Sequence, residues 1–430
     1  MVTVIFADDK ARRSLRSVSK MLNSGDIAWV LCATALVMIM TPAVGFFYGG
    51  LVRIKNLVST IVQCLAIFAA ISLVWAMWGY SLALGGHSIG GIIGSLSDFG
   101  LTNVGVAPNP AYAATIPEVL YVAFQLKFAA ITPALIIGAF AERVRFKSLL
   151  IFVVLWTTFV YVPVVHWIWA VGGWLRVLGV VDFAGGMVVH ETAGVSALAA
   201  AIFIGRRKHL TPKGEIRPNN IPFVILGAAI LWFGWFGFNA GSALAADGIA
   251  ANALLVTNLA AAAGAMSWMI TDWIRKGKPS AVGISVGAVC ALATITPASG
   301  YVGPLASIII GAAAGLVCNF VASWRARTRL DDSLDVFACH GAGGILGSIA
   351  TGIFASTAIN AAGPNGLLYG NMYQLIVQVF GVVVVGFFAF VGSYIILRVI
   401  NVFTPVRVSP TEEDAGLDIS QHGEEAYTGT

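Results

Sequence analysis

Eleven apolar runs, each long enough to cross a membrane, dominate this 430-residue sequence. About 20 apolar residues in a helix cross the roughly 30 Å hydrocarbon core of a bilayer. Charged residues make up only 10% of the chain, against about 25% in an ordinary soluble domain. The sequence therefore predicts an all-α membrane protein with eleven transmembrane helices. The predicted spans are 27–50, 58–83, 118–141, 148–170, 184–204, 221–241, 252–273, 281–298, 304–323, 336–356 and 372–398.

Basic residues are unevenly distributed between the loops that join these spans. The loops after odd-numbered spans carry sixteen Lys and Arg residues, whereas the loops after even-numbered spans carry only Arg176. Because cytoplasmic loops are enriched in Lys and Arg, we expect a multi-pass protein of the inner (cytoplasmic) membrane with the first set of loops inside. The predicted organisation is an N-terminal extracellular segment 1–26, a transmembrane domain 27–398 and a cytoplasmic C-terminal tail 399–430. The five basic residues among the first twenty oppose this orientation.

Two aspartates stand in equivalent places, each eight residues before a histidine near the start of a span. The pairs Asp182–His190 and Asp332–His340 are separated by the same 150 residues. Ten of the eleven spans can form two halves of five with opposite orientation, plus a C-terminal helix, and such inverted repeats are common in transporters. At 1.5 Å per residue, each histidine lies about 12 Å along its helix from the aspartate. We therefore expect His190 and His340 to meet near the centre of the bundle.

Histidines inside apolar spans have competing interpretations. A single buried histidine is more often a hydrogen-bonded part of the core, but a symmetric pair favours a pathway, because ionisable groups in spans are costly and mark function. His190 and Glu191 also begin like the zinc motif HExxH, which would make the chain a membrane metalloenzyme. The second histidine of that motif is absent from the sequence. We expect no metal, no cofactor and no enzymatic activity, and stoichiometric metal in the purified protein would favour the alternative.

Aromatic residues at helical spacing lie between the histidines and the outer side in this topology. Phe124 and Phe128 are four residues apart on the third span, and so about 6 Å apart in depth. The sixth span runs in the opposite direction, which places Phe124 near Ser242 and Phe128 near Phe238. Aromatic residues in this spacing are most often core, but here they form an outer layer above an apolar constriction. The candidates are Phe124, Phe128, Trp169, Trp235, Phe238 and Ser242.

These layers favour one kind of substrate. Ring faces and a hydroxyl can collect a cation, at about 0.5 to 2 kcal/mol for each cation–π contact. The same cation could not pass bare phenyl rings, because an isolated charge in a medium of low dielectric costs tens of kcal/mol, whereas losing a proton costs less. Potassium and sodium have no proton to lose, and the carbonyl-ring sequence TVGYG of potassium filters is missing. Ammonium fits these constraints best.

Several long stretches resemble the ammonium transporter, methylammonium permease and Rhesus protein family over nearly all of residues 27 to 427. They are TPAVGFFYGGLVRIKN, AFQLKFAAITPALIIGAFAERVRF, HWIWAVGGW, VDFAGGMVVH, GWFGFNAGSA, DDSLDVFACHGAGGILG and GLDISQHGEEAY. The resemblance implies a bacterial or archaeal ammonium transporter, or channel, of nitrogen metabolism. It implies eleven helices with a five-plus-five inverted repeat plus a C-terminal helix, and a homotrimer with one pore in each subunit. Methylammonium is a further candidate substrate.

The resemblance also assigns roles to residues. It places the recruitment site on Phe124, Trp169 and Ser242, supported by Asp182; the gate on Phe128 and Phe238; and the pore on His190 and His340, with Trp235 in its wall. The tail segment GLDISQHGEEAY resembles the part through which family members couple their subunits and respond to nitrogen-signalling proteins of the PII class. Regulation by such a partner is therefore expected at the cytoplasmic face.

Two positions depart from the family pattern, which usually has uncharged residues at 127 and 191. Lys127 lies within the third span, next to a gate phenylalanine, and Glu191 follows a pore histidine. Because burying either charge alone is expensive, we hypothesise that Lys127 and Glu191 pair between the third and fifth spans, away from the pore. In the alternative, each finds backbone, water or a subunit boundary.

The rival function of a different class is an ammonium sensor that signals through its cytoplasmic tail. Receptors of this family are expected to carry a fused output domain, and here only about thirty residues follow the last span. That length disfavours a sensor, although the tail could still signal through a partner. Ligand-dependent partner binding without measurable uptake would favour the sensor.

Overall fold

The computed structural model describes residues 21–208, 210 and 217–427. Ten helical stretches in this part of the chain are long and apolar enough to cross a membrane, and a shorter apolar helix, α12 (Ala281–Ile295), lies among them. Together they match the eleven predicted runs, so the chain is a multi-pass membrane protein. The predicted N-terminal segment lies outside the described residues except for 21–26.

The spans differ in how their helices are built. Five are single α-helices: α2 (Ser24–Leu51), α11 (Gly248–Lys276), α12, α13 (Pro304–Arg325) and α15 (Met372–Phe403). The others join an α-helix to a π-helical or 3-10 segment: α3 (Leu57–Val74) with η2 (Trp75–Gly79) and α4 (Tyr80–Ala83); α5 (Glu118–Ile136) with η4 (Ile137–Phe140); α6 (Phe146–Trp156) with η5 (Thr157–Tyr161), α7 (Val162–Trp169) and, beyond a turn, α8 (Trp174–Val177); η6 (Gly186–Glu191) with α9 (Thr192–Ile204); α10 (Ile221–Trp235) with η7 (Phe236–Ala240); and η8 (Phe337–Ala342) with α14 (Gly343–Phe354).

Polar capping residues determine where several spans begin. The side chain of Asn23 accepts hydrogen bonds from the backbone N–H groups of Gly25 (2.8 Å) and Asp26 (3.2 Å), so α2 begins at Ser24, just before the predicted span 27–50. The side chain of Asp247 accepts from Ala250 N at 2.9 Å and begins α11. The eighth predicted run is longer than its helix: α12 ends at Ile295, close before Pro297, and the chain turns there.

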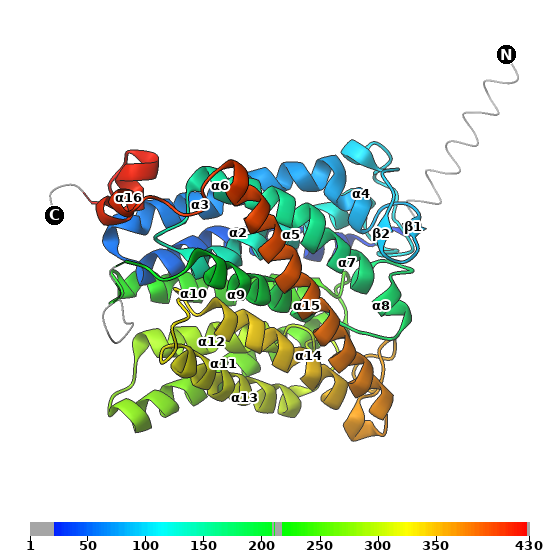
Figure 1. Cartoon of the computed structure of the whole chain (residues 1–430). Helices are drawn as coiled ribbons and strands as arrows, with labels where there is room; N and C mark the ends of the chain where they lie inside the picture. The colour runs from blue at the N-terminus through cyan, green and yellow to red at the C-terminus, as the bar shows by residue number, and fades with distance from the viewer. Residues whose placement is uncertain (1–20, 209, 211–216, 428–430) are drawn as a thin grey trace, which may run out of the picture.

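Figure 1 shows the helices packed side by side as a single bundle, with α15 crossing it diagonally. α15 packs on α9, α14 and α6. α2 packs on α10, α3 and α5 on one side of the bundle, and α11 packs on α12 and α13 on the opposite side. A short antiparallel hairpin, β1 (Ser88–Ile89) and β2 (Ile93–Gly94), lies in the loop after the second span. Nothing in the sequence indicated this hairpin.

The loops after the odd-numbered spans lie at one end of the bundle, called here the basic end. Arg207 contacts two buried carboxylates there, with Nη2 2.8 Å from Oδ1 of Asp331 and Nη1 3.1 Å from Oε2 of Glu142. Nε of Arg53 lies 3.1 Å from the same Glu142 oxygen. Burial raises the pKa of Asp331, but Arg143 and Arg207 lower it further, so the pKa lies below its ordinary value. These arginines, predicted only as topology signals, therefore also join four loops.

The described part of the tail docks onto the basic end. After α15 the chain forms α16 (Pro410–Ala415), begun by a capping box of Ser409 and Glu412, and the π-helical turn η10 (Asp418–His422). The carboxylate of Asp418 accepts hydrogen bonds from Val58 N (3.0 Å) and Ser59 N (2.7 Å), at the first turn of α3. The tail thus caps a helix of the bundle. α15 itself runs to Phe403, five residues beyond the predicted end at 398.

Candidate functional site

A cavity of about 400 Å³ opens at the end of the bundle opposite the basic end. Five of the predicted site residues line it: Phe124, Phe128, Trp169, Asp182 and Ser242. They come from α5, from the end of α7, from the loop before η6 and from the turn after η7. The structure therefore brings the predicted outer layer together, and we call this cavity the vestibule.

Asp182 acts on the backbone beside the vestibule. Its Oδ1 accepts hydrogen bonds from Gly185 N (2.8 Å) and Gly186 N (2.6 Å), and its Oδ2 accepts from the next two N–H groups, at 2.8 and 3.0 Å. These four donors are the free N–H groups at the start of η6, where a negative charge is stabilised. The carboxylate therefore fixes the position of the segment that carries His190. Both of its oxygens are already accepting hydrogen bonds from backbone N–H groups.

Two phenylalanine rings separate the vestibule from the interior. The ring centroids of Phe128 and Phe238 are 4.3 Å apart, with an interplanar angle of 45°. Phe128 also meets Phe124 edge-on at 4.9 Å and Trp169 at 5.9 Å. The two phenylalanines are 1% and 0% exposed. A molecule leaving the vestibule toward the centre of the bundle therefore meets a closed pair of apolar rings.

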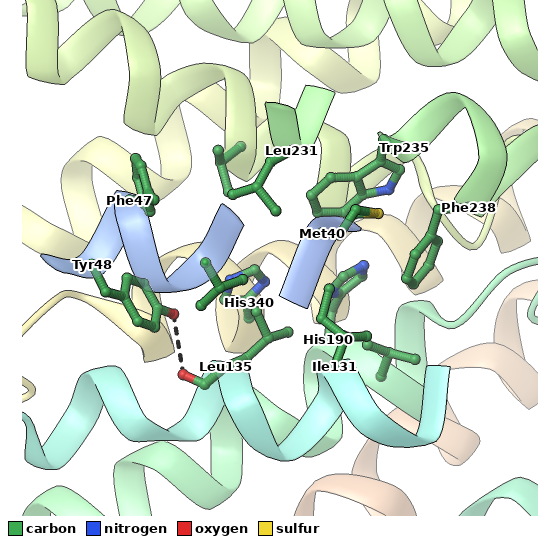
Figure 2. Close-up of a pocket in the computed structure, with 13 residues that line it drawn as sticks. Met40, Phe47, Tyr48, Ile131, Leu135, His190, Leu231, Trp235, Phe238 and His340 are labelled. Atoms are coloured by element: carbon green, nitrogen blue, oxygen red, sulfur yellow. Dashed lines mark hydrogen bonds between the residues drawn. The ribbon is translucent and has the colours of Figure 1, made fainter. Parts of the chain in front are cut away.

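His190 and His340 lie beyond this ring pair, in the middle of the bundle (Figure 2). Their ring centroids are 5.3 Å apart with an interplanar angle of 20°, so the imidazoles stack. Trp235 stacks on His190 at 5.3 Å and donates from Nε1 to Oγ1 of Thr296 at 2.9 Å. A narrow cavity of about 10 Å³ runs beside the rings, between Phe238 and apolar side chains that include Met40, Phe47, Ile131 and Leu231.

The ring nitrogens of this histidine pair are poor in partners. Among the described residues, neither nitrogen of His190 and not Nδ1 of His340 has a hydrogen-bond partner, although both side chains are buried. Buried polar groups in proteins are normally satisfied, and exceptions point to strain or function. The pair therefore offers unused donors and acceptors in an otherwise apolar channel.

Close backbone packing brings the two histidines together. A Cβ added to Gly194 of α9 would lie 1.9 Å from the backbone N of Gly341, so the two segments cross without side chains between them. Shifting both residues by the 150-residue offset gives Glu191 and Gly344, and a Cβ on Gly344 would lie 2.6 Å from Glu191 N. The crossing thus has the twofold relation expected of an inverted repeat.

Several site residues stand on π-helical segments, which the sequence analysis did not predict. His190 lies in η6, Phe238 in η7 and His340 in η8. One extra residue in a turn rotates the following side chains and leaves backbone groups outside the regular pattern, and such bulges occur frequently at functional sites. The only signal for η6 and η8 in the sequence is the matched Asp-to-His spacing.

A model of the ammonium transporter family matches residues 28–427 of this sequence. That match covers nearly the whole chain and all the residues of the vestibule, the ring pair and the histidine pair. The chain belongs to the ammonium transporter family. The predicted resemblance is therefore confirmed.

Individual members of the ammonium transporter family are similar along their whole length. The Bacillus subtilis (strain 168) protein named ammonium transporter is 45% identical over 408 residues, which are 94% of this chain and 99% of that protein. The crystal structure of Candida albicans Mep2 superimposes with a TM-score of 0.86 at 36% identity, over 92% of this chain and 88% of that chain. A structure titled "Sensor Amt Protein" has a TM-score of 0.85 at 29% identity, over 93% and 98% of the two chains.

The structure contradicts the predicted ion pair between Lys127 and Glu191. Lys127 Nζ lies 5.1 Å from the ring centroid of Phe68 on α3, and Lys127 is only partly buried. Glu191 is fully buried and turns toward α15, where a Cβ on Gly386 would lie 3.1 Å from Oε1. The two side chains leave their helices in different directions. The cost of burying either charge alone suggested the pair, and the directions of the two side chains exclude it.

Arg176 is a vestibule residue that the sequence analysis missed. It lines the cavity together with Tyr112 and Tyr121, whose rings stack at 5.3 Å. Arg176 Nη1 donates to the backbone carbonyl of Trp169, and its side chain remains exposed. In the sequence its position indicated only the outer side of the membrane. The fold brings α8 back over the vestibule and adds a positive charge to its rim.

Proposed function

We propose that this chain transports ammonium across a membrane, with the cation collected in the vestibule, deprotonated and passed along the histidine pair. One observation carries the proposal: the vestibule, the closed phenylalanine rings and the stacked imidazoles follow each other along one path through the bundle. Membership of the ammonium transporter family supports the same substrate.

The vestibule suits a small cation with N–H donors. Phe124 and Trp169 offer ring faces, and each cation–π contact stabilises by about 0.5 to 2 kcal/mol. The hydroxyl of Ser242 donates to the backbone carbonyl of Phe238 at 2.8 Å. Its proton is therefore engaged, and its lone pairs remain to accept from a donor. Ammonium, with four N–H groups, satisfies both features.

The ring pair then selects for a substrate that can lose its charge. Phe128 and Phe238 present only carbon and hydrogen, and a bare cation between them costs far more than proton loss. Ammonia without the proton is small and neutral. Beyond the rings, the unpaired nitrogens of His190 and His340 can donate to it or accept from it. Trp235 in the wall keeps His190 in place by stacking.

The assembly and its surroundings extend the proposal. We place the chain in the inner membrane as a homotrimer with a pore in each subunit, with residues 1–26 outside and 399–430 in the cytoplasm. The docked tail and the basic end are the proposed contact for a PII-class protein. We also propose methylammonium as a substrate, and no catalytic activity; among the described residues no group of three His, Cys, Asp or Glu side chains could hold a metal ion.

Transport is tested with purified protein in liposomes under an inward ammonium gradient, with lumenal pH and charge movement recorded together. We expect a flux that His340→Ala reduces or alters in its charge movement. Net charge movement would show that the proton follows the substrate, whereas neutral flux would show that it returns outward. No flux above that of empty liposomes would contradict the proposed function.

A sensor is the alternative function, and similarity to the structure titled "Sensor Amt Protein" favours it. A sensor would bind ammonium in the same vestibule and change the docking of residues 404–427 at the basic end. Ammonium-dependent exposure of the tail to protease, without any flux in liposomes, would support the sensor over the transporter.

A further inference from the structure

Lys127 carries an ammonium group in the middle of a span, and no carboxylate of the described residues forms an ion pair with it. It stands nine residues after the first residue of α5, Glu118, and so about 14 Å along the helix. Within the described residues it has no hydrogen bond or ion pair. Its Nζ makes a cation–π contact with the ring of Phe68. It is half-buried and lies on the side of α3 and α5. Charged side chains in spans almost always face the protein interior, water or a partner group.

Asn258 is a second polar side chain placed on the outer surface of the bundle. It stands ten residues after Gly248, the first residue of α11, and so about 15 Å along that helix. Its exposed neighbours on this surface are apolar, with Leu254 at 40% and Leu255 at 46% exposed. Away from the span ends, no other described side chain with an amide, hydroxyl or carboxyl group is as exposed on the spans. Like the ammonium group of Lys127, the side-chain amide of Asn258 would find no hydrogen-bond partner in lipid.

Hydrogen bonds to the start of α2 show that the two helices begin at the same level. Asn23 N donates to the carbonyl of Thr115, three residues before α5, at 2.9 Å. Asp26 Oδ1 accepts from Ala246 N, two residues before α11, at 2.8 Å. The two helices also descend from the same end of the bundle. Lys127 and Asn258 therefore lie at nearly the same depth.

The helices that carry the two residues lie on different sides of the bundle, since α5 packs with α2 and α3, and α11 packs with α12 and α13 (Figure 1). The two residues therefore do not meet within one chain. A rotation about an axis along the membrane normal carries every residue to a neighbouring copy at an unchanged depth, and contacts between two different surfaces then close into a ring. The side chain at the right depth on the opposite surface is Asn258.

We propose that Lys127 of one subunit donates hydrogen bonds to the amide oxygen of Asn258 of the partner subunit, and that this contact fixes the register of the ring. It supplies each of these two polar side chains with a partner that it lacks among the described residues. The occupant of the surface is a second copy of this chain. The inference requires an assembled ring and does not depend on the transport of ammonium.

Contact is tested by photocrosslinking in the native membrane. A benzophenone amino acid replaces Lys127, because benzophenone reacts with nearby C–H bonds in an apolar environment. We expect a covalent dimer whose adduct maps to α11 within one turn of Asn258. The matched control carries the same group at Phe387, which is 72% exposed on α15 and should give no dimer. An adduct elsewhere in the partner, or none from an intact oligomer, would overturn the proposal.

Introducing a negative charge at Asn258 tests whether the two residues interact, as distinct from a change in how the subunits pack. In Asn258→Asp the amide becomes a carboxylate, which Lys127 can pair with. We expect this variant to raise the temperature at which the purified oligomer dissociates in detergent, and to lower that temperature when it is combined with Lys127→Met. A shift of the same sign in both backgrounds would show that the two residues do not interact, whether or not the protein transports ammonium.

Discussion

At the residue scale, the positive charge of Arg176 on the vestibule rim would oppose the cation that we propose Phe124 and Trp169 bind. Two unit charges about 10 Å apart in water repel by about 0.4 kcal/mol, which is roughly a twofold change in binding. We therefore expect Arg176→Gln to lower the half-saturating ammonium concentration by roughly twofold at low ionic strength, as measured by flux into liposomes. Arg176→Lys keeps the charge and should leave that concentration unchanged.

Salt provides the control for this prediction. Screening shortens the reach of an exposed charge to about 10 Å at 0.1 M salt and about 3 Å at 1 M. The difference between Arg176→Gln and the unmodified chain should therefore disappear at high salt. A difference that persists there would mean that the side chain acts by shape, through its contact with the carbonyl of Trp169.

Depth could be predicted from the sequence for single residues, but the direction of a side chain could not. The spacing of Asp182 and His190 placed the histidine near the centre, and the structure stacks it on His340. The cost of burying a lone charge suggested that Lys127 and Glu191 pair, and that pair was wrong because the cost says nothing about the direction of either side chain. Hydrophobic periodicity does not predict which face of α5 or α9 is buried, because both sides of each helix are apolar. Which side of such a helix meets lipid is settled only by packing.

At the scale of elements, the crossing of α9 and η8 depends on two glycines that leave no room for a side chain. A Cβ at Gly194 would lie 1.9 Å from Gly341 N, and neither backbone can move away cheaply. We expect Gly194→Ala to destabilise the protein by about 1 to 3 kcal/mol or more. Thermal unfolding in detergent measures the loss. Gly248→Ala, at an open position on α11, is the matched control and should be neutral.

The start of η8 should carry a pH dependence. Asp332 Oδ2 accepts from Phe337 N at 2.7 Å, and burial, with Asp335 nearby, raises the pKa of Asp332 to about 6. Because this pKa exceeds the ordinary value of 3.8, the folded protein holds an extra proton between about pH 4 and 6. Stability from this group is therefore full at low pH and is lost as the pH rises through about 6.

Asp332→Asn should remove that loss, because the amide oxygen still accepts from Phe337 N and cannot ionise. The distance between the two pKa values corresponds to at most about 3 kcal/mol. We expect the unfolding temperature of Asp332→Asn to rise relative to the unmodified chain between pH 4.5 and pH 7. Parallel curves across that range would contradict a raised pKa at this position.

The π-helical segments mark the limit of prediction for the elements. The approximate extents of the spans followed from apolar length, and caps such as Asn23 determine where the helices begin. The π turns around His190, Phe238 and His340 did not, because a π turn has the same composition as an α turn. It forms where Asp182 gathers four N–H groups and where the glycines let the segments cross, which are tertiary conditions.

At the scale of the whole molecule, the inverted repeat brings the two halves of the chain together where the segments of His190 and His340 cross. The proposed path for the substrate runs through this crossing. The 150-residue offset relates Asp182 to Asp332, His190 to His340 and the contact at Gly194 to the contact at Gly344. The basic residues also act at this scale, since Arg207 joins loops that are distant in sequence through Asp331 and Glu142. Counting charges predicted the location of these loops but not their mutual contacts.

The central claim is that the closed rings of Phe128 and Phe238 admit only a substrate that can give up a proton. Purified protein in liposomes, exposed in turn to equal gradients of ammonium and of potassium, tests it most directly. The account predicts a flux with ammonium and none above background with potassium, although the two ions have the same charge. Potassium flux equal to that of ammonium would contradict it.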